Sequence, residues 1–179
     1  DLSFAVHQVC QFMSIRCEAH LIAAKQILRY VSSTLNFRIF FQHGPLYLLA
    51  FSDSDWAGDP FNCRSTIGYL VYLGLNPITW SAKKQDTMSR SSTESKYRAF
   101  ATAVAEVCWI RQVLHDLGIF LSFPPKLWCD NVFALAIASN LVFHARTKHV
   151  EVDYHFVHKR VLRRDLQVHY IATGDQLAD

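Results

Sequence analysis

Four acidic residues occupy positions from which side chains can do chemistry. Asp53 ends the apolar strand pattern "LYLLAFSD", and Asp130 ends the short strand pattern "KLWCDN". Glu94 lies in the first turn of a long helical pattern, and Asp175 lies where a last helical pattern begins. Strand ends and helix starts can carry functional groups without disturbing the core. Because hard Mg²⁺ prefers oxygen ligands, carboxylates at such positions raise the question of a metal site.

Each of these acids also has an ordinary structural explanation. The helix dipole favours acidic side chains at helix N-termini, which accounts for Glu94 and Asp175. An Asp-Asn pair after a strand, such as Asp130-Asn131, is common in turns and helix caps. Taken singly, each acid is therefore better explained by structure, and only the set in its order indicates a site.

The elements that must position these acids follow from the pattern of residues 46–179. Strand-like runs at 46–55, 65–74 and 78–85 are joined by short connections, which predicts an antiparallel meander. A long helix follows at 90–118, capped by Ser91, Ser92 or Thr93 and stopped by Gly118. The remaining order is a strand at 126–131, helices at 132–140 and 148–165, a strand at 166–172 and a final helix from 174. Hairpin strands followed by strand–helix alternation predict a mixed sheet with helices on its faces.

Residues 1–45 form a different kind of segment. Two helical patterns fill residues 1–31, and the second places Leu21, Ala24 and Leu28 on one face. The run "LNFRIFF" at 35–41 is β-like, and Gly44-Pro45 interrupts it. We expect a small helical appendage, although the pattern also permits these residues to join the main core.

The motifs "FSDSDWAGD", "RSTIGY", "ITWSAKKQDTMSRSSTESKYRA", "WCDN", "HARTKHVEVDYHFVHKRV" and "TGDQLAD" occur in this order. Together they resemble the ribonuclease H domain of copia-type (Pseudoviridae) LTR-retrotransposon Pol polyproteins, and the resemblance spans essentially the whole chain. It implies an α/β (α+β mixed) ribonuclease H-like fold at 46–179, with a five-stranded sheet in the order 3-2-1-4-5. Residues 1–45 resemble the connection segment that precedes this domain.

The resemblance also implies a catalytic set and its cofactor. By motif, Asp53, Glu94, Asp130 and Asp175 would be both the catalytic residues and the ligands of two Mg²⁺ ions, for which Mn²⁺ could substitute. Asp55 and Asn131 would support these ligands, and Asp59 reads as a turn residue. Lys96 stands where family members often have an acid, but two residues from Glu94 on a helix we expect it to point elsewhere. The histidine that other ribonucleases H often carry before the last acid is absent from "IATGDQ".

The implied function is hydrolysis of the RNA strand of RNA/DNA hybrids, with 5′-phosphate and 3′-hydroxyl products, during reverse transcription. The reverse transcriptase portion of the same polyprotein would be the partner. Two other hypotheses stay open: a catalytically silent hybrid-binding or connection module, and a host-recruited nuclease acting on branched DNA.

Two basic or polar stretches are candidates for contacts with nucleic acid. One leads directly to Glu94, and the other precedes the basic helix; a polar loop and a solvated helix face are the alternatives. The candidate residues are Lys83, Lys84, Gln85, Arg90, Ser91, Ser92, Arg146, Lys148 and His149.

Composition limits the classes of protein to which this chain can belong. The chain has 179 residues, of which 51% are hydrophobic, so a packed core is expected and a disordered chain is excluded. The net charge of +3 is compatible with nucleic acid without being diagnostic. No apolar run approaches the roughly 20 residues of a membrane helix, so no membrane partner is expected. Five cysteines without a C-x-x-C pair predict reduced, mostly buried thiols in a cytosolic or nuclear setting rather than secretion. The resemblance implies that the cytoplasmic setting would be a virus-like particle.

Overall fold

The computed structural model describes residues 2–15, 17–59, 61–132, 135–136 and 151–178. They divide into two compact units, residues 1–41 and residues 42–179. This division lies close to the boundary expected at residue 45. Among the described residues, no helix is both long enough and apolar enough to cross a membrane.

The first unit consists of two helices, as the sequence predicts. They are α1 (Leu2–Cys10) and α2 (Glu18–Ser33), and neither buries a residue fully. The strand expected at 35–41 is wrong: the chain is irregular from residue 37 to residue 47, and Phe37, Phe40 and Phe41 are exposed. A strand is stable only when it pairs with a neighbour, and the five-stranded sheet of the described residues does not include this segment.

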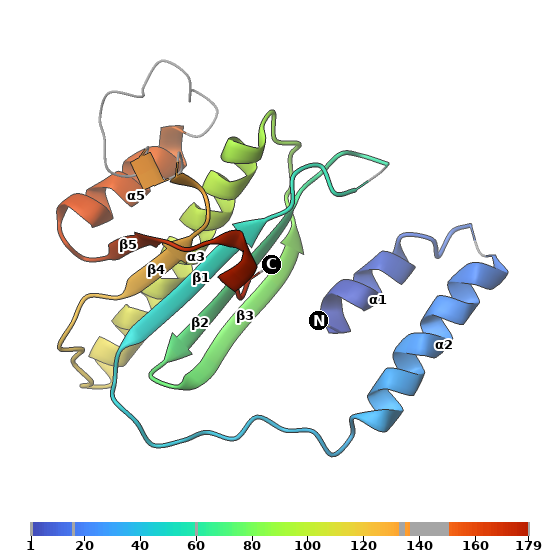
Figure 1. Cartoon of the computed structure of the whole chain (residues 1–179), viewed down its shortest axis with the longest axis horizontal. Coiled ribbons are helices and arrows are strands. Elements are labelled where there is room, and N and C mark those ends of the chain that lie inside the picture. Colours follow the sequence, from blue (N-terminus) through green and yellow to red (C-terminus); the bar gives the residue numbers. More distant parts are fainter. Residues whose placement is uncertain (1, 16, 60, 133–134, 137–150, 179) are drawn as a thin grey trace. The chain divides into compact units, whose positions relative to one another are not determined.

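The second unit is built on a five-stranded sheet in the order β3-β2-β1-β4-β5, which confirms the predicted fold class (Figure 1). Strands β1, β2 and β3 pair antiparallel, whereas β4 and β5 extend the sheet parallel to β1. The bounds are β1 Leu48–Ser54, β2 Thr66–Leu73, β3 Asn76–Lys84, β4 Lys126–Cys129 and β5 Gln167–Tyr170.

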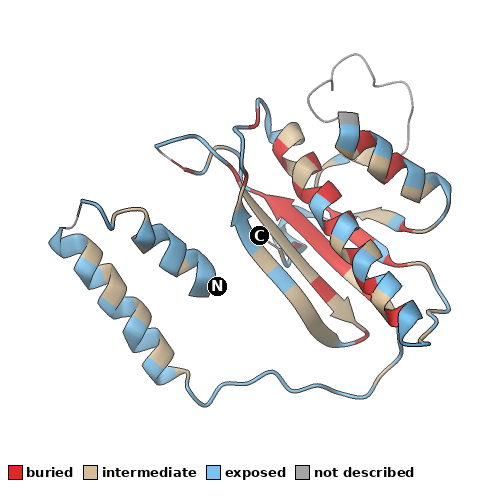
Figure 2. Cartoon of the chain, turned by 180° about the vertical axis from the view of Figure 1, so that it is seen from behind, coloured by how far each residue is buried: buried red, intermediate tan, exposed pale blue. Residues whose placement is uncertain are grey.

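Two helices, α3 (Ser92–Asp116) and α5 (Glu151–Leu162), cover one face of this sheet (Figures 1 and 2). The core lies beneath α3, where Phe100 and Val107 are buried with Leu127 of β4. Ser91 caps α3 by accepting a hydrogen bond from the Glu94 amide, one of the caps that the sequence predicts. The helix ends at Asp116, two residues before the predicted stop at Gly118, whose φ of +76° suits glycine.

The C-terminal segment differs from the prediction. A 3₁₀ turn, η3 (Thr173–Asp175), stands where a final helix was expected, and no α-helix follows it within the described residues. Gln176 ties the segment to β1 because its side-chain amide donates to the Ser52 carbonyl at 3.1 Å. Gly68 permits this approach, since a Cβ there would lie 2.2 Å from the Ala178 carbonyl oxygen.

Two further expectations have mixed outcomes. The predicted helix at 132–140 and the start of the basic helix at 148–150 lie largely outside the described residues. All five cysteines are free thiols, but the expectation that most are buried is wrong, because Cys10, Cys17 and Cys63 are exposed. Cys129 is buried as expected, and burial raises the pKa of its thiol to about 11.

Candidate active site

Asp53 and Asp130 lie side by side at the carboxyl ends of two neighbouring strands. Strands β1 and β4 are parallel and pair Ser52 with Cys129, so the next residue of each chain segment is an aspartate. Both side chains are shielded from solvent, with exposed fractions of 8% for Asp53 and 3% for Asp130. Two members of the predicted acidic set are thus brought together at the sheet edge where open α/β sheets bind ligands.

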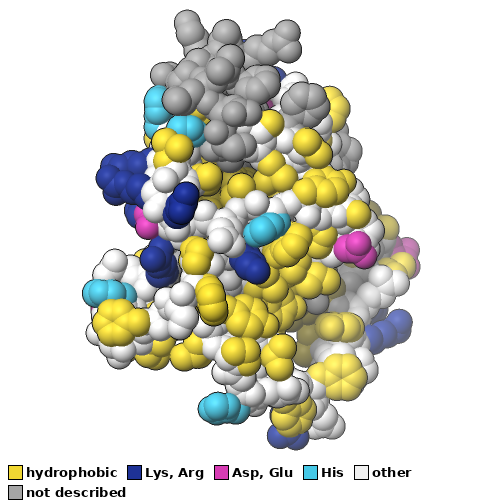
Figure 3. Space-filling view, turned by 60° about the vertical axis from the view of Figure 1, so that its left-hand side comes forward, with side chains coloured by type: hydrophobic (Ala, Val, Ile, Leu, Met, Phe, Trp, Pro, Cys, Tyr) yellow, Lys and Arg dark blue, Asp and Glu magenta, His cyan; other side chains and the backbone are white. Residues whose placement is uncertain are grey.

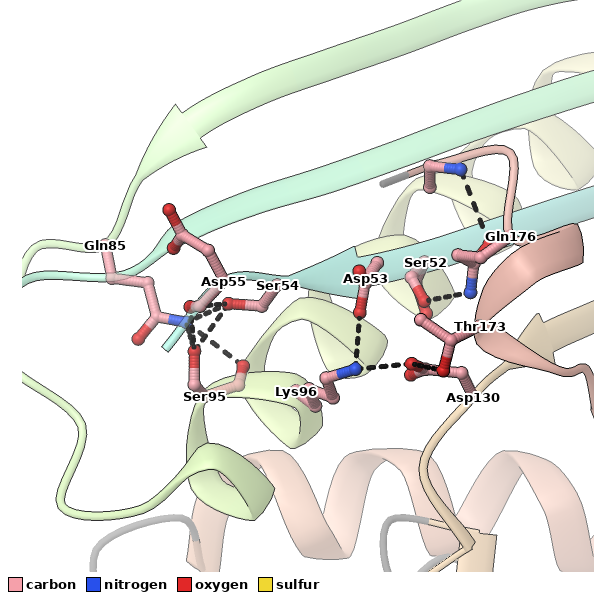
Figure 4. Close-up of polar contacts among 11 residues, drawn as sticks. Ser52, Asp53, Ser54, Asp55, Gln85, Ser95, Lys96, Asp130, Thr173 and Gln176 are labelled. Carbon is pink, nitrogen blue, oxygen red and sulfur yellow. Dashed lines mark hydrogen bonds and ion pairs between the residues drawn. The ribbon is translucent and has the colours of Figure 1, made fainter. Parts of the chain in front are cut away.

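The ammonium group of Lys96 lies between these two carboxylates (Figure 4). Its Nζ is 2.5 Å from Asp130 Oδ2, to which it donates a hydrogen bond, and 3.0 Å from Asp53 Oδ1. The contact with Asp53 is an ion pair. The expectation that Lys96 points away from the site is therefore wrong.

Lys96 remains charged in this setting. Burial disfavours the ammonium form, but the hydrogen bond to Asp130 and the attraction of Asp53 outweigh burial and raise the pKa of Lys96 above its ordinary value. A cation thus already sits where the resemblance implies Mg²⁺. Two carboxylates with an ammonium between them do not fit a divalent metal ion in this arrangement.

Glu94 is held by contacts of its own helix terminus. Its Oε1 accepts a hydrogen bond from Arg98 at 2.8 Å, and its Oε2 accepts one from the Arg90 amide at 3.0 Å. With the Ser91 cap, this arrangement resembles a capping box, which explains the acid without catalysis. Residues two apart on an α-helix lie on nearly opposite sides, so Lys96 faces the aspartates and Glu94 does not.

Asp175 is exposed on the 3₁₀ turn, and the structure does not bring it into a metal cluster. Among the described residues, no three His, Cys, Asp or Glu side chains are grouped so as to hold a metal ion. The same turn instead contributes Thr173, whose hydroxyl donates to Asp130 Oδ2 at 3.1 Å. Asn131, directly after Asp130, is half-buried, and its carbonyl accepts from the Leu135 amide.

The other acids of the "FSDSDWAGD" stretch shape the turn after β1. Asp55 is exposed and accepts a hydrogen bond from the Thr66 amide at the start of β2. Asp59 accepts from the Phe61 amide and pairs with Lys84, which together hold the pKa of Asp59 below its ordinary value. These contacts are those of turn residues.

Gln85 has an internal role in place of the expected contact with nucleic acid. It is buried, and its amide donates to the Ser95 carbonyl at 3.0 Å and to the Ser95 hydroxyl at 3.2 Å. Its carbonyl accepts from the Ser89 hydroxyl at 2.6 Å. This network, part of which Figure 4 shows, ties the loop before α3 to the end of β1.

The remaining candidates for nucleic-acid contacts divide between exposed, paired and undescribed positions. Lys83, Arg90, Ser91 and Ser92 are exposed, while Lys84 is half-buried against Asp59. Arg146, Lys148 and His149 lie outside the described residues.

Reasoning from the sequence missed Lys96, Thr173 and Gln176 as parts of the site. The spacing of hydrophobic residues along α3 could have placed Lys96 on the buried side of the helix. Positions 96, 100, 103, 107, 110 and 114 form one stripe of α3, and every member after Lys96 is a buried hydrophobic residue. No sequence signal points to Thr173 or Gln176, because both act through a contact distant along the chain.

The chain is similar to known proteins in two respects, its sequence and its fold. No protein-family model matches the chain. It is 49% identical over 180 residues to the retrovirus-related Pol polyprotein from transposon RE1 of Arabidopsis thaliana, a match covering 100% of this chain and 12% of that protein. The corresponding polyprotein from transposon TNT 1-94 of Nicotiana tabacum is 33% identical over 179 residues, covering 100% of this chain and 13% of that protein. The chain thus spans about one eighth of these relatives.

The second likeness concerns the fold. The crystal structure of LC11-RNase H1 in complex with an RNA/DNA hybrid matches with a TM-score of 0.54 at 10% identity, covering 73% of this chain and 88% of that chain. At that identity the match establishes the ribonuclease H fold alone. Sequence and fold agree: the chain is homologous to one part of the retrovirus-related Pol polyproteins of transposons, and it has a ribonuclease H fold.

Proposed function

We propose that this chain occupies the place of the ribonuclease H domain in a transposon Pol polyprotein and that it binds RNA/DNA hybrids without efficient cleavage. The ligand is suggested by LC11-RNase H1, whose structure contains an RNA/DNA hybrid. The partner would be the reverse transcriptase portion of the same polyprotein, linked through residues 1–41. Its place of action would be a cytoplasmic virus-like particle or the nucleus.

The observation that carries this proposal is the ammonium of Lys96 between Asp53 and Asp130. The hydrolysis expected from the resemblance depends on divalent ions bound by these aspartates. Because Lys96 already balances part of their charge, the geometry favours the hypothesis of a hybrid-binding domain with a silenced centre.

Metal-dependent hydrolysis of the RNA strand, with 5′-phosphate and 3′-hydroxyl products and Mg²⁺ as cofactor, is the second candidate function. One observation favours it: Asp130 Oδ1 is buried and has no hydrogen-bond partner. Buried carboxylate oxygens normally have partners, so lone pairs remain that a cation could use. This function requires Lys96 to leave its present position.

Contacts with a hybrid would come from the exposed residues at the end of β3 and at the start of α3. Lys83 suits phosphates, and Ser91 and Ser92 suit the 2′-hydroxyl groups that distinguish RNA. Figure 3 shows one face of the molecule, on which hydrophobic side chains gather and lysine and arginine side chains lie among and around them.

Fluorescence anisotropy tests the proposal with labelled duplexes of one sequence as RNA/DNA hybrid, double-stranded DNA and double-stranded RNA. We expect the hybrid to bind most tightly, with affinity falling as salt rises. Lys83→Ala should weaken binding several-fold. Lys126→Ala is the matched control, because Lys126 is an exposed lysine at the opposite end of the sheet, where β4 begins. Equal affinity for hybrid and double-stranded DNA would contradict the proposal, and preference for a four-way junction would favour a nuclease on branched DNA.

A further inference from the structure

The fold determines the position of the Lys96 side chain, which is not a surface side chain in chance contact with an acid. It begins the buried stripe of α3, so the backbone directs it toward the sheet. Its side chain is 19% exposed, and its ammonium group contacts two aspartates at the carboxyl ends of two different strands (Figure 4). A long flexible side chain loses considerable rotamer entropy in such a place, and two short contacts compensate for it.

The charges of the cluster are arranged around this ammonium. Two carboxylates and one ammonium leave one net negative charge, which is less than a divalent ion would meet without Lys96. Asp130 Oδ2 is already occupied twice, by Lys96 at 2.5 Å and by Thr173 Oγ1 at 3.1 Å. A divalent ion bound by the same aspartates would lie within a few ångströms of the ammonium and be repelled by it.

We infer that Lys96 takes the place of a metal ion in this domain, so that its acidic centre is held together without metal and its hybrid binding is metal-independent. The centre is then a structural ion-pair cluster at the end of β1 and β4. A single residue maintains this state, because Asp53 and Asp130 are otherwise placed as metal ligands would be. Replacing Lys96 by glutamate would put a third carboxylate beside them and create an oxygen ligand set suited to Mg²⁺ or Mn²⁺.

Isothermal titration of the 179-residue chain with Mn²⁺ alone tests the inference without nucleic acid. We expect no saturable binding by the wild-type chain at millimolar Mn²⁺, and at least tenfold tighter binding by Lys96→Glu. Mn²⁺ should also raise the Tm of Lys96→Glu and leave that of the wild-type chain unchanged. Lys83→Glu makes the same charge change at an exposed site and should gain nothing. Adding Asp53→Asn to Lys96→Glu should abolish the gain.

The outcome that overturns the inference is saturable Mn²⁺ binding by the wild-type chain that Asp53→Asn removes. If circular dichroism shows that Lys96→Glu does not fold, Lys96→Gln takes its place, since it removes the ammonium without adding charge. Tighter Mn²⁺ binding by Lys96→Gln than by the wild-type chain supports the inference, and unchanged binding refutes it.

The statement about hybrid binding rests on the proposed function and has its own measurement. The wild-type Kd for a labelled RNA/DNA hybrid should agree within twofold in EDTA and in Mg²⁺ at matched ionic strength. A Kd that tightens tenfold or more with Mg²⁺ would contradict metal independence. Failure to bind any hybrid would defeat the proposed function, whereas the Mn²⁺ titrations would still decide the role of Lys96.

Discussion

Removing the charge of Lys96 by Lys96→Met should destabilise the fold strongly. Each unit-charge pair about 4 Å apart contributes about 4 kcal/mol at an effective dielectric constant near 20, and desolvation offsets much of it. Loss of one partner of a buried ion pair costs about 3–5 kcal/mol. Because Lys96 is 19% exposed, we take the lower end and expect the free energy of unfolding to fall by about 3 kcal/mol.

Equilibrium urea denaturation in EDTA measures this loss without compensation by metal. Arg98→Met is the matched control, because it breaks an ion pair with Glu94 on the other side of the same helix, at a similarly exposed side chain. A pair spaced i,i+4 on a helix contributes under about 1 kcal/mol. Asp130→Asn combined with Lys96→Met should cost less than the sum of the two single changes. Equal losses in Lys96→Met and Arg98→Met would refute the reasoning.

Three further changes test the parts of the fold that surround the centre. Gly68→Ala should lower the Tm and make the C-terminal segment susceptible to proteolysis, because the new Cβ would clash with the Ala178 carbonyl oxygen. Gly174→Ala should do neither, because the space around Gly174 is open. Equal effects of the two changes would argue against a close contact between Gly68 and Ala178. Gln85→Ala removes the acceptor of the buried Ser89 hydroxyl and a donor to the Ser95 carbonyl, which should cost about 1–3 kcal/mol in urea denaturation. A loss below about 0.5 kcal/mol would show that the network contributes little. The hydrogen bond from Lys84 lowers the pKa of Asp59, so the contribution of Asp59 to stability is complete above its ordinary pKa of 3.8 and is lost as the pH falls through the lowered pKa. Asp59→Asn should therefore flatten the acid side of the curve of Tm against pH. An unchanged curve would contradict this.

Local patterns were sufficient to predict most of the sheet. Alternating β-branched and aromatic residues marked β2 and β3, and apolar runs ending in acids marked β1 and β4. The run at 35–41 carries the same local signal but forms no strand, because a strand depends on a partner that local sequence does not specify. The expected C-terminal helix failed similarly, since the anchors of that segment are Ser52 and Gly68 on distant strands.

The site shows a sharper limit of motif reasoning. The order of acids led to Asp53 and Asp130, which the structure brings together, and also to Glu94, which it uses at a helix cap. A motif gives the order of residues but not the side of the helix on which each lies. The helical period supplies that information, and it places Lys96 on the stripe that continues into the core.

The measurement that tests the central claim most directly is cleavage of an RNA/DNA hybrid labelled on its RNA strand, resolved on a denaturing gel. The wild-type chain in Mg²⁺ or Mn²⁺ should bind the hybrid and leave its RNA strand intact over hours. Cleavage by the wild-type chain that Asp53→Asn abolishes would contradict the claim that Lys96 silences this centre.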